Sequence, residues 1–460
     1  MNGCSIIVAV ILIGTSALGQ SPVATPPQAA VPVAGKPAEP SGDEDPVEIL
    51  VQLRDHVVAH GERIPNHTCV ETIQRDVYEP AAGRAPKSCD ALLGAIKQRP
   101  AGQRLRLDSS DRLRLDVAYA SGREIYSWAG ASRFEEGELD ELVPEGAMGT
   151  GPFATMLLSI FTANRGPKYI FEGETAAAGR RLFQYSFAVV RLQSHYQVKA
   201  QKEWIVAGYT GTLLVDPKTA ELVRLTVRTE ELPPATDTCE TDTTLEYGLV
   251  KLAGEDYILP RLARQRFIGR EGTEAENTME FSACRDFQAE SKVAFGESSP
   301  AKQEQAGTPP AALDLPRGLP VTVELLTPVR FSDAAAGDLI QGRLASAIRD
   351  ERGHPLIAEG TAVQGRLMRV ETRYQPAEHT VVLRWETIDA AGARVPLTLL
   401  PNRKGPKLTP AGMVGSALRL RVTGFELPRT GETRYGIVQL PGDRKTLDSG
   451  SRSEWFTAKP

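Results

Sequence analysis

The chain has 460 residues, of which 41% are hydrophobic and 24% charged, and its formal net charge is −5. These values are ordinary for globular proteins, and the length allows two or three domains with cores of their own. The basic residues form no block with interleaved aromatic residues, which argues against a nucleic-acid partner.

The first residues have the pattern of an export signal. Residues 5–13 are a short apolar run, and Ala17-Leu18-Gly19 follows it as a cleavage site. We interpret residues 1–19 as a secretory signal peptide. A membrane anchor is the alternative, but the run is shorter than the roughly 20 residues of a spanning helix. Cys4 precedes the run, which argues against a lipid anchor, and we expect no membrane span after signal cleavage.

Four cysteines follow the signal, namely Cys69, Cys89, Cys239 and Cys284. In an exported chain they predict disulfides, and four cysteines allow three pairings. We favour Cys69–Cys89 and Cys239–Cys284, because each pair lies within one local block of sequence. Free buried thiols are the alternative. No C-x-x-C motif is present and the histidines lie elsewhere, so a metal centre is not expected here.

Residues 20–45 are rich in Pro, Ala, Gly and Val and predict a disordered linker. Residues 46–59 predict a helix. Its apolar residues fall near one face and are Val47, Leu50, Val51, Val57 and Val58. His56 and His60 are four residues apart on it, a spacing that can ligate a metal. With no Glu between them and no third ligand nearby, we interpret them as a solvated helix end.

The segment 152–163 predicts an apolar helix among strands. Its large apolar residues recur at helical spacing and are Phe153, Met156, Leu157, Ile160 and Phe161. Thr150 can cap this helix, Pro152 suits its first turn, and the segment 164–167 ends it. Because the flanking segments predict strands, the helix must lie against a sheet to bury this face.

Alternating apolar residues predict strands over most of the remaining chain. Residues 46–296 form a meander with short connections, which predicts a curved antiparallel sheet. Residues 297–315 are polar and predict a second linker. Residues 316–442 predict a small all-β barrel or sandwich, and residues 443–460 a loose tail. The fold class is therefore mainly β (α+β).

Residues 46–296 resemble the open-barrel family of periplasmic lipoprotein carriers and the related envelope-stress sensor domain. The features that carry this resemblance are the long meander, the apolar helices laid into the sheet, and the hairpin Asp216-Pro217-Lys218-Thr219 before Val223-Arg224-Leu225. The resemblance implies an antiparallel open half-barrel whose apolar hollow accepts acyl chains. The expected disulfides and the second domain depart from that family.

Residues 320–400 are similar to the periplasmic β-barrel of conjugation and type IV secretion channel proteins. The matching residues are Thr327-Pro328-Val329, Gly337-Asp338, Leu356-Ile357-Ala358-Glu359-Gly360-Thr361, Gly365-Arg366 and Arg384-Trp385-Glu386. Glycine in tight turns avoids Cβ strain at positive φ. No transmembrane anchor precedes this region, so the resemblance does not imply a channel.

The whole chain also resembles a group of uncharacterised exported proteins of soil bacteria. The motifs that carry this likeness are Asp111-Arg112-Leu113-Arg114-Leu115-Asp116, Gly122-Arg123-Glu124-Ile125-Tyr126-Ser127-Trp128 and Phe281-Ser282-Ala283-Cys284-Arg285. The resemblances together imply an exported protein in the periplasm or at the outer membrane.

The sequence contains no recognisable catalytic constellation. H-E-x-x-H, G-x-S-x-G, the phosphate loop and the dinucleotide fingerprint are all missing. The acidic segment 134–142 lacks the spacing of an EF-hand and predicts a solvated helical face rather than a calcium site. We therefore expect no enzyme, no metal and no cofactor, with an unrecognised hydrolase as an alternative.

The function expected from these patterns is a non-catalytic cell-envelope protein. Its first domain would hold a lipid or other apolar ligand against Phe153, Met156, Leu157, Ile160 and Phe161. The alternative for this helix is that it simply fills the core. The alternative for the protein is a structural envelope protein that binds a protein partner and no small ligand.

Overall fold

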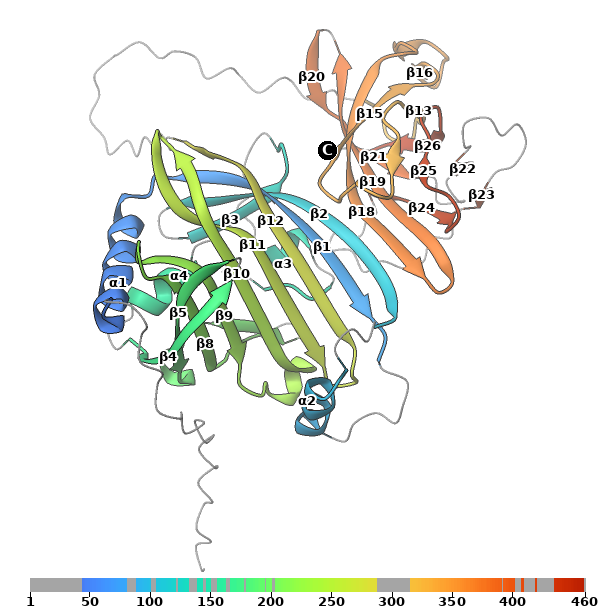
Figure 1. Ribbon diagram of the computed structural model, residues 1–460. Coiled ribbons are helices and arrows are strands. Elements are labelled where there is room, and N and C mark those ends of the chain that lie inside the picture. Colours follow the sequence, from blue (N-terminus) through green and yellow to red (C-terminus); the bar gives the residue numbers. More distant parts are fainter. Residues whose placement is uncertain are drawn as a thin grey trace, which may run out of the picture. The chain divides into compact units, whose positions relative to one another are not determined.

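Most of the protein is antiparallel β-sheet, as predicted (Figure 1). The computed structural model describes residues 44–80, 88–100, 105–120, 123–131, 139–143, 146–149, 155–162, 166–177, 179–194, 196–200, 203–287, 315–390, 392–401, 407–408, 418–419 and 434–458. The predicted signal peptide and nearly all of both predicted linkers lie outside the described residues.

Within the described residues one large sheet has 18 strands, and ten of them form its first region. They are β1 (His67–Tyr78), β2 (Leu107–Ala120), β3 (Arg123–Trp128), β4 (Lys168–Ala177), β5 (Arg180–Val189), β8 (Tyr209–Asp216), β9 (Glu221–Thr229), β10 (Thr238–Leu252), β11 (Glu255–Gly269) and β12 (Glu274–Asp286). A separate hairpin joins β6 (Gln197–Ala200) to β7 (Glu203–Val206). Short 3₁₀ turns, η1 (Arg191–Gln193) and η2 (Pro234–Thr236), lie in the connections.

The strands follow the spatial order β4-β5-β8-β9-β10-β11-β12-β1-β2-β3, and every neighbouring pair is antiparallel. The last strand of the meander, β12, thus returns to pair with the first, β1. Within the described residues no ladder joins the edge strands β3 and β4, so this part is an open half-barrel.

Alternating burial gives the sheet one apolar face. On β5, for example, Phe183, Tyr185 and Phe187 are buried at every second position. Successive side chains on a strand point to opposite faces, so these three point to the same side. They join one hydrophobic core with the inward residues of β1, β2, β8, β9 and β10.

Two helices cover part of this apolar face. Helix α1 (Pro46–Arg63) begins at Asp45, whose side chain accepts a 2.8 Å hydrogen bond from the backbone N–H of Val47. It buries Ile49 and Leu53, whereas Val47 and Val51 are exposed. The helix was predicted correctly, but the prediction put Val47 and Val51 on its apolar face, which is wrong.

Helix α4 (Thr155–Thr162) confirms the predicted apolar helix, and it packs beside α1 (Figure 1). Two further helices complete this part of the chain. Helix α3 (Leu139–Leu142) is a single turn at the end of the acidic segment. Helix α2 (Cys89–Lys97), which no sequence pattern indicated, begins at Ser88, whose hydroxyl accepts from the N–H of Ala91.

The second part of the chain is all β, as predicted, and has a hydrophobic core of its own. Its strands are β13 (Pro320–Leu325), β14 (Val329–Arg330), β15 (Leu339–Leu344), β16 (Ile348–Arg349), β17 (Pro355–Ile357), β18 (Ala362–Tyr374), β19 (Ala377–Ala390), β20 (Ala393–Pro396), β21 (Leu399–Pro401), β22 (Lys407–Leu408), β23 (Leu418–Arg419), β24 (Gly436–Pro441), β25 (Thr446–Leu447) and β26 (Arg452–Thr457).

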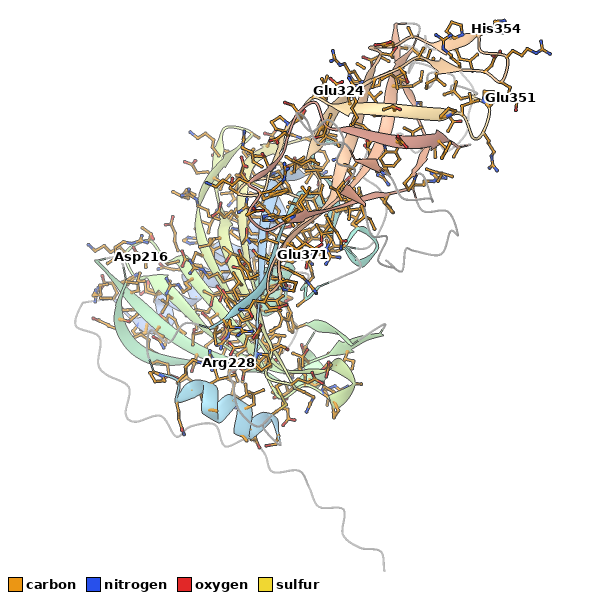
Figure 2. The ribbon with its side chains drawn as sticks, turned by 90° about the vertical axis from the view of Figure 1, so that its right-hand side faces the viewer. Asp216, Arg228, Glu324, Glu351, His354 and Glu371 are labelled. Atoms are coloured by element: carbon orange, nitrogen blue, oxygen red, sulfur yellow. A yellow bond between two sulfur atoms is a disulfide. The ribbon has the colours of Figure 1, made fainter. Side chains whose placement is uncertain are left out.

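Ion pairs connect strands within the second part of the chain, and a short ladder joins this part to β2. Glu324 on β13 accepts from Arg343 on β15 at 2.6 Å and pairs with Arg452 on β26 at 2.9 Å (Figure 2). On β18, Glu371 lies opposite Asp111 of β2, where the ladders of the two sheet regions join (Figure 2).

The predicted loose tail over 443–460 is wrong for its described residues. Strand β26 pairs with both β13 and β21, and Trp455 on it is only 2% exposed within the second core. The alternation of Ser453, Trp455 and Thr457 on one face of the strand is the signal that the sequence prediction overlooked.

All four cysteines form disulfides, but the predicted pairing is wrong. The bonds are Cys69–Cys284 and Cys89–Cys239. The first joins neighbouring strands β1 and β12, and the second joins α2 to the start of β10. The prediction paired cysteines that are close in sequence, whereas the return of β12 to β1 brings distant segments together.

Candidate functional site

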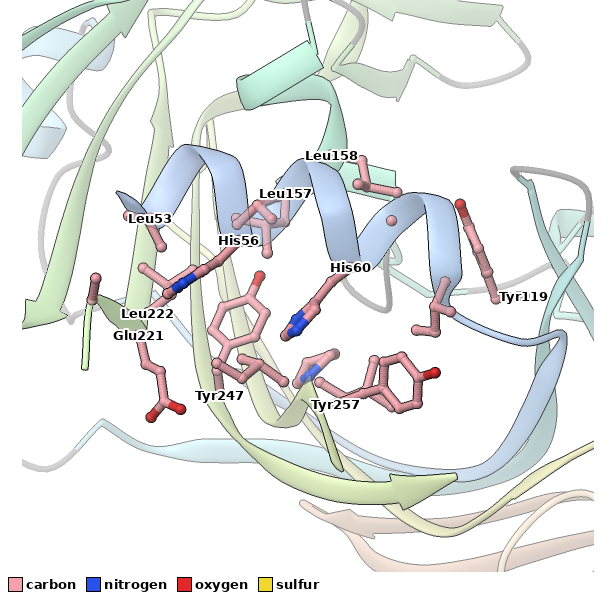
Figure 3. Close-up of a pocket in the computed structure, with 17 residues that line it drawn as sticks. Leu53, His56, His60, Tyr119, Leu157, Leu158, Glu221, Leu222, Tyr247 and Tyr257 are labelled. Atoms are coloured by element: carbon pink, nitrogen blue, oxygen red, sulfur yellow. The ribbon is translucent and has the colours of Figure 1, made fainter. Parts of the chain in front are cut away.

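A hollow lies between the two helices and the sheet, and it is the candidate site (Figure 3). Helix α1 and helix α4 form one wall, and β9, β10 and β11 the other. Its volume is about 60 Å³. The lining residues are Leu53, His56, Val57, His60, Gly61, Ile64, Tyr119, Leu157, Leu158, Ala220, Glu221, Leu222, Tyr247, Tyr257, Ile258, Leu259 and Pro260.

Contacts at both ends hold α1 over the sheet. At its start, the Tyr185 hydroxyl on β5 donates a 2.8 Å hydrogen bond to the Pro46 carbonyl. Beside it, Arg181 pairs with Glu44 at 2.6 Å. At its end, the Tyr257 hydroxyl on β11 donates to the Arg63 carbonyl at 3.4 Å. These contacts fasten both ends of α1 to the sheet.

Gly61 allows α1 and α4 to approach closely. A Cβ at this position would stand 2.6 Å from Leu158 Cδ2. Because Cδ2 is the flexible end of the Leu158 side chain, the position of this side chain determines how closely α1 and α4 can approach each other. Leu157 and Leu158 therefore form the boundary between the hollow and the core behind it.

Two histidines give the apolar hollow a polar side. His56 and His60 project from the same side of α1 (Figure 3), with ring centroids 6.4 Å apart and nearly parallel planes. His60 also meets the ring of Tyr257 edge-on at 5.9 Å. Burial lowers the pKa of His60, the nearby His56 and Arg63 lower it further, and Glu221 opposes the shift. The neutral ring suits an apolar environment.

Of the predicted ligand-binding residues that the structure describes, one lines the hollow and three lie in the core. Leu157 lines the hollow. Met156, Ile160 and Phe161 are buried in the core, at 6%, 1% and 5% exposure. Phe153 lies outside the described residues. The sequence prediction thus named the helix that borders the hollow, while three of its residues face the core.

A polar cluster lies on the inward face of the sheet beside the hollow. Glu71 on β1 is only 3% exposed, and its Oε2 has no hydrogen-bond partner. On β3, the Tyr126 hydroxyl donates to Glu124 Oε2 at 2.6 Å. Burial raises the pKa of Glu71 to about 8, and the charge of Glu124 adds to this shift. Glu71 is therefore a neutral acid at pH 7.

Tyrosines connect this cluster to the hollow. Tyr119, which lines the hollow, lies directly opposite Glu124 in the β2–β3 ladder, where facing side chains are about 5 Å apart at Cβ. Tyr247, which also lines the hollow, has its phenol pKa raised by burial and by the charge of Glu124. In Figure 3 the Tyr247 hydroxyl points toward α1.

Sequence reasoning missed Glu71, Tyr119 and Tyr247 as site residues. A signal for Glu71 was present, because His67, Cys69, Glu71 and Ile73 alternate on one face of β1. A carboxyl group at an inward position of a strand is an uncommon choice that needs an explanation. The contribution of β10 and β11 depended on the register of the meander, which the sequence did not reveal.

Within the residues that the structure describes, no group of three or more His, Cys, Asp or Glu side chains could hold a metal ion. Helices of the described segments are too short or too polar to span a bilayer. The hollow instead offers apolar surface, hydroxyl groups and carboxyl groups. This arrangement suits binding of an amphipathic molecule.

No protein-family model and no curated protein matches the sequence. Among solved structures, the chain is similar to a DUF1329 family protein from Desulfovibrio piger, with 10% identity, a TM-score of 0.24 and coverage of 53% of this chain and 95% of that one.

It is also similar to a domain named as a candidate outer membrane lipoprotein-sorting protein from Vibrio parahaemolyticus. That match has 8% identity, a TM-score of 0.26 and coverage of 53% of this chain and 94% of that one. Because both TM-scores are low, these likenesses carry no conclusion about function.

Proposed function

We propose that this chain is a non-catalytic protein of the cell envelope that binds a lipid or another apolar ligand in the hollow between α1, α4 and the sheet. The observation that carries this proposal is the lining. Leucine, isoleucine, valine and tyrosine side chains supply most of it, and they come from two helices and four strands. Apolar pockets with a few polar groups are the usual form of small-molecule sites.

The size of the hollow limits what it holds as it stands. A water molecule needs about 10–15 Å³ of such volume, so 60 Å³ has room for roughly four to six waters. A short alkyl segment fits this space. A long acyl chain needs α1 and α4 to move apart, which would bring Met156, Ile160 and Phe161 within its reach.

The free energy of burying an alkyl chain is comparable to that of burying the side chains it would displace. Burying one large apolar side chain contributes about 1.5–3 kcal/mol, so an alkyl chain that replaces Leu157 and Leu158 against the sheet offsets much of the cost of their displacement. Leu157 and Leu158 line the hollow from α4, so a ligand in the hollow would contact them.

The two disulfides support an exported location. Disulfides persist in oxidising compartments and are rare in the cytosol. We therefore propose that the protein is exported to the periplasm or the outer membrane.

Lipid extraction and mass spectrometry of the purified protein test the proposal. We expect a co-purified lipid or other apolar molecule, and native mass spectrometry should show the same added mass on the intact chain. Protein that carries no ligand and takes up no added decanol would contradict it.

A structural envelope protein without a small ligand is the second candidate. The edge strand β4 favours it, because one side of β4 has no ladder among the described residues and Ile170 on it is 39% exposed. Unpaired edges can add strands from another chain. Ligand-free protein that forms oligomers in sedimentation experiments would favour this candidate.

A further inference from the structure

We propose that the ligand carries a positively charged ammonium group, which the carboxyl groups of Glu71 and Glu124 bind beside Tyr119, Tyr126 and Tyr247. The inference rests on the proposed function and names the polar end of the same ligand. The inference is based on the buried polar cluster next to the hollow, because an apolar chain alone would form no polar contact with these groups.

Among the described residues, Glu71 is a buried carboxyl group without an ion-pair partner. Other carboxylates on the strands of this region have partners: Asp111 pairs with Arg75, Glu274 pairs with Arg99 and Arg266, and the buried Asp116 accepts a 2.9 Å hydrogen bond from the N–H of Gly130. Glu71 forms no ion pair among the described residues, and its buried Oε2 accepts no hydrogen bond. A buried polar atom without a partner is unfavourable, and a cation with N–H donors would satisfy it.

The cluster lies next to residues that line the hollow. Glu124 lies across from Tyr119 in the β2–β3 ladder, and Tyr119 lines the hollow. Tyr247 lines the hollow from β10. A ligand with its alkyl chain under α1 would thus have its head group between these two tyrosines, next to the carboxyl groups.

The aromatic surroundings of the cluster suit an ammonium group. Tyrosine rings attract cations through their faces, and aromatic residues recognise ammonium ligands in this way. A hard metal ion such as calcium takes six to eight oxygen ligands, whereas the described residues place no third acidic side chain or histidine with these two in a metal-binding group. An ammonium group fits better than a metal ion.

Binding has a defined proton balance. Glu71 is protonated in the free protein, since burial raises its pKa to about 8. When an alkylammonium ion binds, Glu71 releases its proton to solvent and the resulting carboxylate accepts N–H hydrogen bonds. The other titratable groups on this face are Glu124, Tyr126, Tyr119, Tyr247 and His67. The predicted release at pH 7 is close to one proton per ligand.

Calorimetric titration with three probes of equal chain length tests the inference. The probes are decylammonium, decanol and decanoate, and the proteins are the wild type, Glu71→Gln and Glu124→Gln. Glu271→Gln is the control, because Glu271 is exposed and outside the cluster. We expect the wild type and the control to bind decylammonium about tenfold more tightly than decanol. In Glu71→Gln this preference should fall below about twofold.

The outcomes separate the inference from the proposed function. Equal binding of all three probes, or tightest binding of decanoate, overturns the ammonium site and leaves apolar binding standing. No binding of any probe overturns both. Titrations in two buffers with different ionisation enthalpies measure the proton release, and decylammonium binding without it overturns the assignment to Glu71. Thermal unfolding of each variant establishes that it is folded.

Discussion

Cys69 and Cys284 lie on neighbouring strands with their Cα atoms 4.0 Å apart, although 215 residues separate them in the chain. Their bond joins β1 to β12, where the last strand of the first sheet returns to the first strand. The curved face that carries Glu71 and borders the hollow depends on this junction. The second bond, Cys89–Cys239, fastens α2 to the start of β10.

Replacing both cysteines of the first bond, with Cys69→Ala and Cys284→Ala together, should lower the free energy of unfolding by about 2–5 kcal/mol. The loop that this bond closes is long, so its removal gives the unfolded chain more freedom. Urea denaturation measures the change. Peptide mapping without reduction should recover Cys69 linked to Cys284, and recovery of Cys69 linked to Cys89 would contradict the structure.

Ile160→Ala should destabilise the protein by about 2–5 kcal/mol, because Ile160 is 1% exposed in the first core and its loss leaves a cavity. Leu157→Ala is the matched comparison on the same helix. Leu157 borders the hollow and is half-buried, so its truncation should have the smaller effect on stability. Denaturation curves that reverse this order would place the core on the other face of α4.

Tyr185→Phe should lower stability by about 0.5–1.5 kcal/mol, since it removes the hydrogen bond to the Pro46 carbonyl. The loss should be local, with faster hydrogen exchange at the start of α1. Tyr257→Phe removes a longer contact, at 3.4 Å, and should change exchange at the end of α1 less. Unchanged exchange along α1 in both variants would show that these hydroxyls do not hold the helix.

Glu71 should contribute a decrease in folding stability as the pH rises from 5 to 8, whereas the lowered pKa values of His60 and His67 contribute in the opposite direction as the pH rises toward 6.5. The pKa of Glu71 is about 8 in the folded protein and has the ordinary value of 4.5 when unfolded. At this group the folded state therefore binds more protons in this range, so the contribution is full below pH 4.5 and is lost as the pH passes through 8. The slope is on the order of 1.4 kcal/mol per pH unit.

Glu71→Gln should remove the contribution of Glu71 to the pH dependence, and Glu271→Gln should keep it. Chemical denaturation at pH 5, 6.5 and 8 measures both variants beside the wild type. An equal slope in Glu71→Gln and in the wild type would show that Glu71 titrates in the folded protein much as it does in the unfolded chain.

Local patterns in the sequence predicted α1, α4 and most of the strands, but the prediction missed helix α2 and strand β26. The spacing of Met156, Leu157, Ile160 and Phe161 predicted α4, and strict alternation predicted most of the sheet. Patterns of this kind act within a few residues of each other. The patterns predicted the buried face of α4 better than that of α1. On α1, Ile49 and Leu53 are buried, whereas Val47 and Val51 are exposed.

Long-range pairing was not predictable in the same way. Pairing Cys69 with Cys89 was reasonable by sequence distance, but the register of β1 against β12 decided the bond. The hollow has the same origin, since Tyr119, Tyr247 and Leu157 come from three separate segments. The predicted domain boundaries and the resemblance of residues 320–400 to secretion-channel barrels stay predictions.

The most direct test of ligand binding in the hollow is a substitution on α4 that fills this space. Leu157→Trp puts an indole ring into the space, and Leu192→Trp makes the same change on η1, where Leu192 is 98% exposed. Calorimetric titration with decanol should show at least tenfold weaker binding to Leu157→Trp and wild-type affinity for Leu192→Trp. Equal affinity in both folded variants would contradict the claim that the ligand binds between α1, α4 and the sheet.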